Sequence, residues 1–150
     1  MDKHARILVV DDDETIRKTI RAILEDEGYR VDLAASGKEA IQKSEKIAYN
    51  IALLDIRLPD MEGVELLELL KDNVPRTRKV MVTGYPSMQN AIAALNKKAD
   101  AYIVKPIDVE QLLNTVQEQL QLQEEEKEFS EVKVAEFIES RVKELSIDNP

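Results

Sequence analysis

Polar side chains that can do chemistry follow each of four short apolar runs in this sequence. The residues after the runs are, in chain order, Asp11-Asp12-Asp13, Asp55, Thr83 and Lys105. Carboxylates gathered in one place resist ionising together, and a divalent cation with hard oxygen ligands, such as Mg²⁺, relieves their repulsion. A lysine and a hydroxyl beside them would hold oxygens of a tetrahedral anion while one carboxylate acts as nucleophile. These residue types therefore predict a site for phosphoryl chemistry.

Each of these residues also has an ordinary structural explanation. Asp12 or Asp13 would cap the helix that follows the first run. Asp55 and Thr83 would be turn residues, and Lys105 an exposed surface lysine. The chemical interpretation therefore depends on all of them meeting at one place in the fold.

The apolar runs themselves predict the strands of a parallel sheet. They are short and lack alternation of apolar and polar residues, which is typical of strands covered on both faces. A fifth segment, 29–33, does alternate and is expected to be an edge strand. Helical spacing of apolar residues fills the intervals. The predicted strands are 7–10, 29–33, 51–54, 80–82 and 102–104, and the predicted helices 16–24, 40–47, 64–74, 88–95 and 109–120.

Five strand-helix units in succession predict an α/β fold with a parallel sheet, right-handed crossovers and helices on both faces. We expect the strand order 2-1-3-4-5, with the alternating strand at an edge. In such sheets ligands bind at the carboxyl ends of the strands, where the strand order reverses. That edge would bring Asp11 and Asp12 to face Asp55.

Composition excludes several other classes of function. The chain has 150 residues, 30 acidic and 21 basic, with no cysteine and a single histidine, His4. It therefore lacks the residues for disulfides, thiolate metal sites and multi-histidine centres. No apolar run is long enough to cross a membrane, and the surplus of acid argues against direct nucleic-acid binding. We expect a soluble, cytoplasmic domain.

The motifs resemble the receiver domain of two-component response regulators over about residues 5–120. The resemblance rests on several motifs in matching order, and the strand order 2-1-3-4-5 is that of the chemotaxis receiver. These motifs are Val9-Val10-Asp11-Asp12, Leu54-Asp55-Ile56-Arg57-Leu58-Pro59-Asp60-Met61-Glu62-Gly63, Val82-Thr83-Gly84, and Tyr102 with Lys105-Pro106.

The resemblance implies a role for each residue of the predicted site. Asp55 would accept a phosphoryl group from the phosphohistidine of a sensor histidine kinase or phosphotransfer protein, and the chain would be a regulatory phosphoacceptor rather than an enzyme. Thr83 and Lys105 would hold phosphoryl oxygens, and the Lys105-Pro106 peptide would be cis. The ligands of Mg²⁺ would be Asp12 directly, Asp11 mainly through water, Asp55, and the backbone carbonyl of Arg57.

The resemblance also implies a conformational switch. Thr83 would move toward the phosphoryl group and Tyr102 would turn inward, which changes the face made by the fourth helix, fifth strand and fifth helix. This face would bind partners or a second copy of the chain. Arg57 and Tyr85 occupy positions that tune hydrolysis in receivers, and we hypothesise that their bulk prolongs the phosphorylated state.

An alternative from another class is a haloacid-dehalogenase-type phosphatase that uses Mg²⁺. The pattern Asp11-x-Asp13-x-Thr15 is similar to the nucleophile motif of those enzymes and would make Asp11 the nucleophile. The chain has no evident insertion for a substrate-selecting cap, and Asp55 would have no role.

Residues 121–150 stand apart from a receiver at residues 1–120. From Glu118 onward there are ten acidic and four basic residues, followed by helical spacing of Val134, Phe137, Ile138, Val142 and Leu145. We expect a helical extension, or a linker to an output domain. As a further alternative, this helix would act as a dimerisation or interaction module, although Glu124-Glu125-Glu126 interrupts any coiled-coil seam.

Overall fold

The computed structural model describes residues 4–71, 73, 75–84, 87–96 and 98–147. Five parallel strands form one sheet in the order β2-β1-β3-β4-β5, which confirms the predicted order and the edge position of β2. The strands are β1 (Arg6–Val10), β2 (Arg30–Ala34), β3 (Ile51–Leu54), β4 (Arg78–Thr83) and β5 (Ala101–Val104). The helices are α1 (Glu14–Asp26), α2 (Gly37–Lys46), α3 (Gly63–Leu69), α4 (Met88–Asn96) and α5 (Val109–Ile147).

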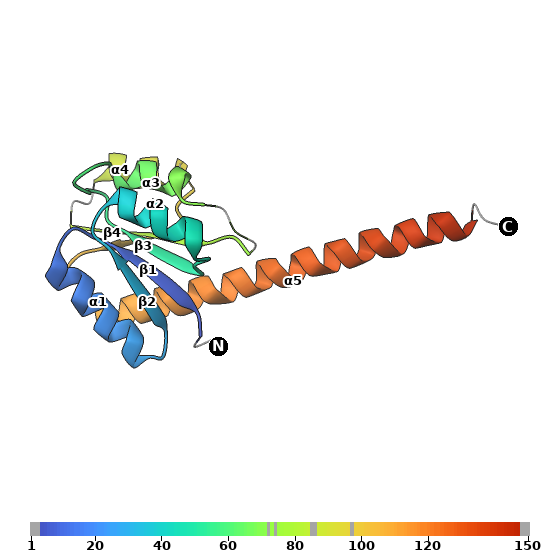
Figure 1. Cartoon of the computed structure of the whole chain (residues 1–150), viewed down its shortest axis with the longest axis horizontal. Helices are drawn as coiled ribbons and strands as arrows, with labels where there is room; N and C mark the ends of the chain where they lie inside the picture. The colour runs from blue at the N-terminus through green and yellow to red at the C-terminus, as the bar shows by residue number, and fades with distance from the viewer. Residues whose placement is uncertain (1–3, 72, 74, 85–86, 97, 148–150) are drawn as a thin grey trace.

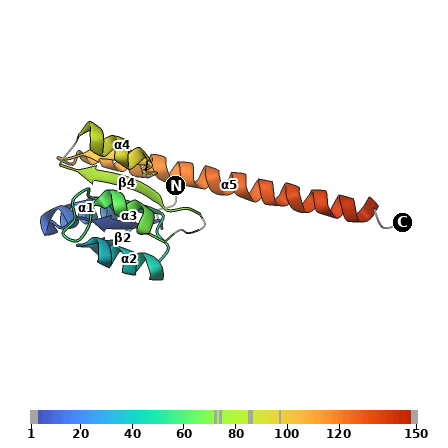
Figure 2. The ribbon, with the colours of Figure 1, turned by 90° about the horizontal axis from the view of Figure 1, so that it is seen from above.

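Helices cover both faces of the sheet, with α1 and α5 on one face and α2, α3 and α4 on the other (Figures 1 and 2). Successive residues of a strand point to opposite faces. Ile7 and Val9 of β1 accordingly belong to the cluster that includes α1 and α5, while Leu8 and Val10 belong to the cluster with α2 and α3. The aliphatic runs thus supply two cores, which explains why they do not alternate with polar residues.

Helix α3 is shorter than the apolar spacing predicts. It ends at Leu69, and the backbone of Leu70 is extended, with φ −68° and ψ 139°. Side-chain hydrogen bonds then fix the segment after α3. The backbone N–H of Lys71 donates to Ser44 Oγ at 3.3 Å, and the side-chain Nδ2 of Asn73 donates to Thr77 Oγ1 at 3.3 Å. Val74, the last member of the predicted helical stripe, lies outside the described residues.

Helix α5 continues far beyond the sheet and confirms the predicted helical extension. Its 39 residues span about 58 Å at 1.5 Å per residue, and its second half projects from the α/β domain (Figure 1). Among the described residues, no helix is both long enough and apolar enough to span a membrane.

A polar network anchors the middle of α5 to the amino ends of β3 and β4. Gln123 is buried, accepts a hydrogen bond from Asn50 Nδ2 at 2.9 Å and donates to the carbonyl oxygens of Asn50 and Arg76 at 3.0 and 2.8 Å. Glu126 lies 3.2 Å from Arg78 and 3.5 Å from Arg76. The helix therefore contacts the α/β domain as far as Glu126.

Candidate functional site

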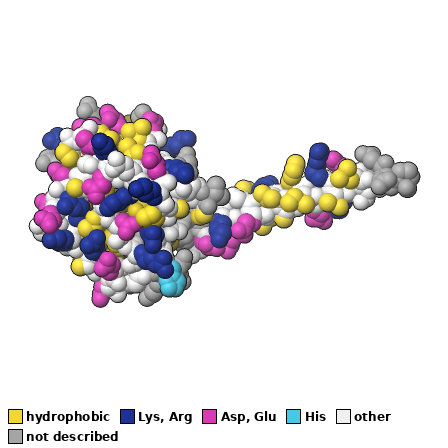
Figure 3. Space-filling view, viewed as in Figure 1, with side chains coloured by type: hydrophobic (Ala, Val, Ile, Leu, Met, Phe, Trp, Pro, Cys, Tyr) yellow, Lys and Arg dark blue, Asp and Glu magenta, His cyan; other side chains and the backbone are white. Residues whose placement is uncertain are grey.

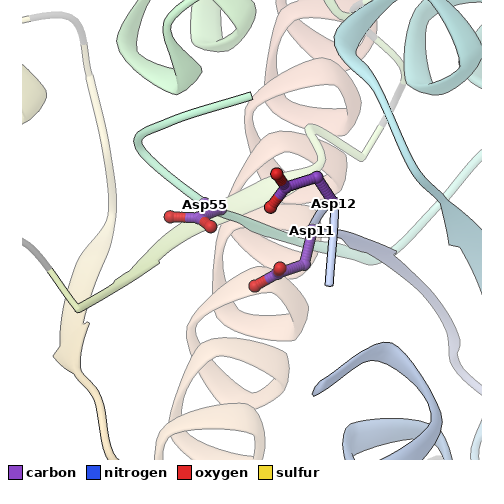
Figure 4. Close-up of side chains that lie close together, drawn as sticks. All are labelled: Asp11, Asp12 and Asp55. Carbon is purple, nitrogen blue, oxygen red and sulfur yellow. The ribbon is translucent and has the colours of Figure 1, made fainter. Parts of the chain in front are cut away.

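Three carboxylates converge at the carboxyl ends of β1 and β3. Asp11, Asp12 and Asp55 each offer one oxygen, and these oxygens all lie within 4.8 Å of one another (Figure 4). The strand order accounts for the meeting, since β1 and β3 are neighbours with Val10 paired to Leu54. Asp11 and Asp55 are 3% and 5% exposed, whereas Asp12 is open to solvent.

Lys105 places a positive charge against two of these carboxylates. Its Nζ lies 2.6 Å from Asp11 Oδ2 and 3.3 Å from Asp55 Oδ2. The Lys105-Pro106 peptide is cis, as the resemblance implied. The N–H of Lys105 donates to the carbonyl of Thr83 at 2.8 Å, and Thr83 is fully buried at the end of β4. The fold thus gathers the polar residues that follow the four apolar runs at one edge of the sheet.

The surroundings of Asp55 and Lys105 shift both pKa values upward. Burial and the charge of Asp11 raise the pKa of Asp55, and these effects outweigh the stabilisation of its carboxylate by Lys105. Burial lowers the pKa of Lys105, but the hydrogen bonds and charges of Asp11 and Asp55 outweigh burial and raise it. Lys105 is therefore held in its charged form, while the carboxylate of Asp55 is destabilised by its site.

The three successive aspartates at the end of β1 have separate structural tasks. Asp13 is the helix cap, because its Oδ1 accepts from the N–H of Ile16 at 3.1 Å, which settles the choice between Asp12 and Asp13. Asp11 is fully engaged, since Oδ1 accepts from the N–H of Asp13 at 2.9 Å while Oδ2 accepts from Lys105. The exposed carboxylate of Asp12 is the one left facing solvent at the site.

The loop after Asp55 closes tightly on itself. The N–H of Gly63 donates to the carbonyl of Ile56 at 2.6 Å, and a β-carbon at Gly63 would lie 1.9 Å from the carbonyl oxygen of Asp55. Farther along the loop, the Asp60 carboxylate accepts from the backbone N–H groups of Gly37 and Lys38, each at 2.9 Å. The motif that ends at Gly63 gave no signal of this close approach to Asp55.

The remaining predicted residues surround the site. Arg57 is exposed, and its N–H donates to Asp55 Oδ1 at 3.4 Å. Tyr102 is half-buried on β5, and its hydroxyl is enclosed without a hydrogen-bond partner in the described part of the chain. Burial raises the pKa of Tyr102. Tyr85 lies outside the described residues.

The donor set of this site fits a hard divalent cation. Carboxylate oxygens are the ligands that Mg²⁺ prefers, and the cluster combines two buried carboxylates with an exposed one. Asp11 is held more tightly than Asp55: its carboxylate oxygens accept hydrogen bonds at 2.9 and 2.6 Å, against 3.4 and 3.3 Å for those of Asp55, which makes Asp55 the better placed nucleophile. The phosphatase alternative is therefore not favoured.

Comparisons with known proteins agree with this site. The family model of the response regulator receiver domain matches residues 7–117. The chain is 48% identical to a CheY-like response regulator receiver domain protein from Methanospirillum hungatei JF-1, with a TM-score of 0.78, covering 82% of this chain and 98% of that one. It is 36% identical to the beryllofluoride-activated NtrC4 receiver domain dimer, with a TM-score of 0.73, covering 79% of this chain and 98% of that one.

Among curated proteins, the chain resembles the regulatory protein AtoC of Escherichia coli K12, with 33% identity over 123 residues, which is 82% of this chain and 27% of AtoC. The chain thus spans between about a quarter and about a half of the length of the curated relatives it matches. The match covers most of this chain, and it includes Asp11, Asp12, Asp55, Thr83 and Lys105. The chain belongs to the family of response regulator receiver domains.

Proposed function

We propose that Asp55 accepts a phosphoryl group from the phosphohistidine of a sensor histidine kinase or phosphotransfer protein. The observation that carries this proposal is the position of Asp55, which lies in one cluster with Asp11, Asp12 and Lys105 at the carboxyl edge of the sheet. A carboxylate oxygen of Asp55 forms the new bond to phosphorus, the bond from phosphorus to the histidine nitrogen breaks, and its electron pair stays on that nitrogen. The product is an acyl phosphate.

Lys105 and Thr83 supply positive charge and a hydroxyl to the transferred group. Lys105 Nζ lies 3.3 Å from Asp55 Oδ2, so it is within reach of oxygens that would be added at that position. Groups fixed in place before the reaction stabilise developing charge without reorganisation. In this way the receiver, which is a phosphoacceptor and not a turnover enzyme, assists its own phosphorylation and the later loss of the phosphoryl group to water.

Asp11, Asp12, Asp55 and the backbone carbonyl of Arg57 would hold Mg²⁺. The contact of Asp11, whose Oδ2 is held by Lys105 at 2.6 Å, would run mainly through water, whereas the exposed Asp12 offers a direct ligand. Bound Mg²⁺ would supply charge neutralisation between the carboxylates and the incoming phosphoryl oxygens.

Phosphorylation would change the conformation of the face made by α4, β5 and α5, and partners would recognise this change. Thr83 would move toward the phosphoryl group and Tyr102 would turn further into the space it leaves. The Tyr102 hydroxyl is enclosed and has no partner among the described residues, which is costly for a buried polar group and supports a side chain poised between two positions. The same face presents three exposed apolar side chains for a partner: Ile92, Val104 and Val109.

The projecting part of α5 would pair with a second copy of this chain. Hydrophobic side chains line the projecting part of α5 in Figure 3. The alternating spacing of three and four residues that is typical of a coiled-coil seam is followed by Ala135, Ile138, Val142 and Leu145. Nearer the receiver the same helical face carries acids at Glu124, Glu128 and Glu131. An antiparallel pair would face Ala135 with Leu145 and Ile138 with Val142 while keeping those acids apart.

Sedimentation of two charge-matched variants tests this pairing. Val142→Glu places an acid on the seam, and Ser140→Glu places one on the opposite side of the same helix turn. We expect a dimer for the native chain and Ser140→Glu, and a monomer for Val142→Glu. A native monomer, or equal behaviour of the two variants, would contradict pairing through this seam. Residues 1–120 would then still serve as receiver, and 121–150 as a linker to an output domain.

Arg57 and Tyr85 would slow hydrolysis of the acyl phosphate by obstructing the attacking water. Arg57 is exposed beside Asp55, which supports this role. We expect Arg57→Ala and Tyr85→Ala to shorten the half-life of the phosphorylated protein. Unchanged half-lives would contradict the proposal.

Because response regulators meet their kinases in the cytoplasm, we place the chain in that compartment.

Incubation with acetyl phosphate tests the phosphoacceptor function. With Mg²⁺ present we expect the intact mass to rise by one phosphoryl group per chain. Chelation of the metal and Asp55→Asn should each abolish the gain, while the exposed-site control Lys18→Ala should keep it. A gain that persists in Asp55→Asn would contradict the proposal.

A further inference from the structure

Arg17 of α1 reaches back over the first turn of its helix to the end of β1. Its Nη1 donates to the carbonyl oxygen of Asp11 at 2.7 Å, and the side chain is half-buried. Acidic side chains lie nearby, since the charge of Arg17 lowers the pKa of both Glu14 and Glu39 after the larger contributions of their own partners. The hydrogen bond of its guanidinium nevertheless goes to a backbone carbonyl at the functional site.

With this contact, the last polar group of Asp11 gains a hydrogen-bond partner. The N–H of Asp11 donates to the carbonyl of Ala34 at 3.1 Å, and its two carboxylate oxygens accept from the Asp13 N–H and from Lys105. With Arg17 on the carbonyl, every polar group of Asp11 has a partner, and the partners come from β2, the start of α1, the loop after β5, and α1 itself.

The carbonyl of Asp11 belongs to the peptide unit that joins Asp11 to Asp12. Because that unit is planar, fixing its oxygen fixes the direction in which the chain enters Asp12. The side chain of Asp12 is exposed and Asp13 is committed to capping α1. The orientation of the Asp12 carboxylate therefore depends on the backbone that Arg17 holds.

We propose that Arg17 is a positioning residue for the divalent-cation site: it fixes the Asp11-Asp12 peptide so that the Asp12 carboxylate faces Asp55. The proposal rests on the proposed metal-dependent function. Groups that orient metal ligands typically contribute about 10- to 100-fold to metal affinity.

Charge alone would give the opposite result. Arg17 adds a positive charge near a cation site, and like charges repel. If the guanidinium acted only through its charge, its removal would strengthen cation binding. If it acts by holding the carbonyl, its removal weakens binding.

Titration with Mg²⁺, followed by calorimetry on the whole chain, separates these possibilities. We expect Arg17→Ala to weaken Mg²⁺ binding about tenfold, and Arg17→Lys, which keeps a donor, to recover much of the loss. The matched control is Lys18→Ala, which removes a neighbouring exposed cation paired with Glu14 at 2.9 Å and should leave affinity unchanged. Equal or tighter binding by Arg17→Ala would overturn the proposal.

Two further measurements distinguish this proposal from others. The free energy of unfolding of Arg17→Ala without metal reports any purely structural role, and a loss of stability with unchanged Mg²⁺ affinity would also overturn the proposal. Asp12→Ala should abolish Mg²⁺ binding. If the native chain binds no Mg²⁺, or Asp12→Ala binds it normally, the proposed metal site itself is wrong and not only the role of Arg17.

Discussion

Gly63 lies directly against the backbone of Asp55, and a β-carbon at Gly63 would be 1.9 Å from the Asp55 carbonyl oxygen. The N–H of Gly63 also donates to the carbonyl of Ile56, the next residue, at 2.6 Å. The start of α3 therefore packs directly on the backbone of Asp55, the proposed phosphoacceptor. Any side chain at position 63 must displace either the helix or Asp55.

We expect Gly63→Ala to lower the free energy of unfolding by about 3 kcal/mol, the upper end of the usual cost of overpacking. The fraction that folds should accept phosphoryl groups more slowly, because Asp55 is displaced. Gly84→Ala is the control, since its β-carbon would meet Lys105 at 3.8 Å, an ordinary contact. Urea unfolding measures both variants, and equal stabilities would contradict the close packing of Gly63 on Asp55.

Asp55→Asn should stabilise the protein at neutral pH. Burial and Asp11 raise the pKa of Asp55 above its ordinary value of 3.8, so the folded state binds the proton more tightly than the unfolded state. Ionisation therefore costs stability as pH rises from 3.8 through the folded pKa, and the full cost remains at pH 7. Urea titrations should show the advantage of Asp55→Asn at neutral pH shrinking as pH falls through this window. An Asn variant less stable at neutral pH would show that Lys105 outweighs burial.

Truncation should locate the end of the receiver unit. A chain ending at Leu120 loses the hydrogen bonds of Gln123 to Asn50 and Arg76 and the ion pairs of Glu126, and we expect it to lose about 2 kcal/mol of stability. A chain ending at Lys127 keeps this network and should match the native free energy of unfolding. Equal stabilities for the two truncated chains would show that the network contributes nothing.

Tyr102→Phe should raise the free energy of unfolding by about 1 kcal/mol, because it removes an enclosed hydroxyl that has no partner among the described residues. Chemical denaturation measures the change. Val104→Ala, a truncation of an exposed neighbour on β5, serves as the control and should have little effect. Destabilisation by Tyr102→Phe would show that the hydroxyl has a partner in this state.

The sheet and the carboxylate site could be predicted because both follow from spacing along the chain. Buried strands of a parallel sheet are continuous apolar runs, and their carboxyl ends must meet at one edge. Asp11 and Asp55 each directly follow such a run, and their strands are neighbours, so the topology alone brings them together. The long helix was also predictable from its periodic apolar residues.

Contacts between one side chain and a particular backbone atom could not be predicted in this way. The hydrogen bond from Arg17 to Asp11 and the approach of Gly63 to Asp55 depend on rotamers and loop geometry, which spacing does not determine. The anchoring of α5 did have a signal. Gln119 and Gln123 continue the buried face of Leu112 and Val116 at helical spacing, but their polarity concealed that they are buried.

The central claim is that Asp55 receives the phosphoryl group, and mapping the modified residue tests it most directly. Protein treated with acetyl phosphate and Mg²⁺ would be reduced with borohydride, which converts a phosphorylated aspartate to homoserine, and analysed by peptide mass spectrometry. Our account predicts conversion at Asp55 alone and none in Asp55→Asn. Conversion at Asp11, or undiminished labelling of Asp55→Asn, would contradict it.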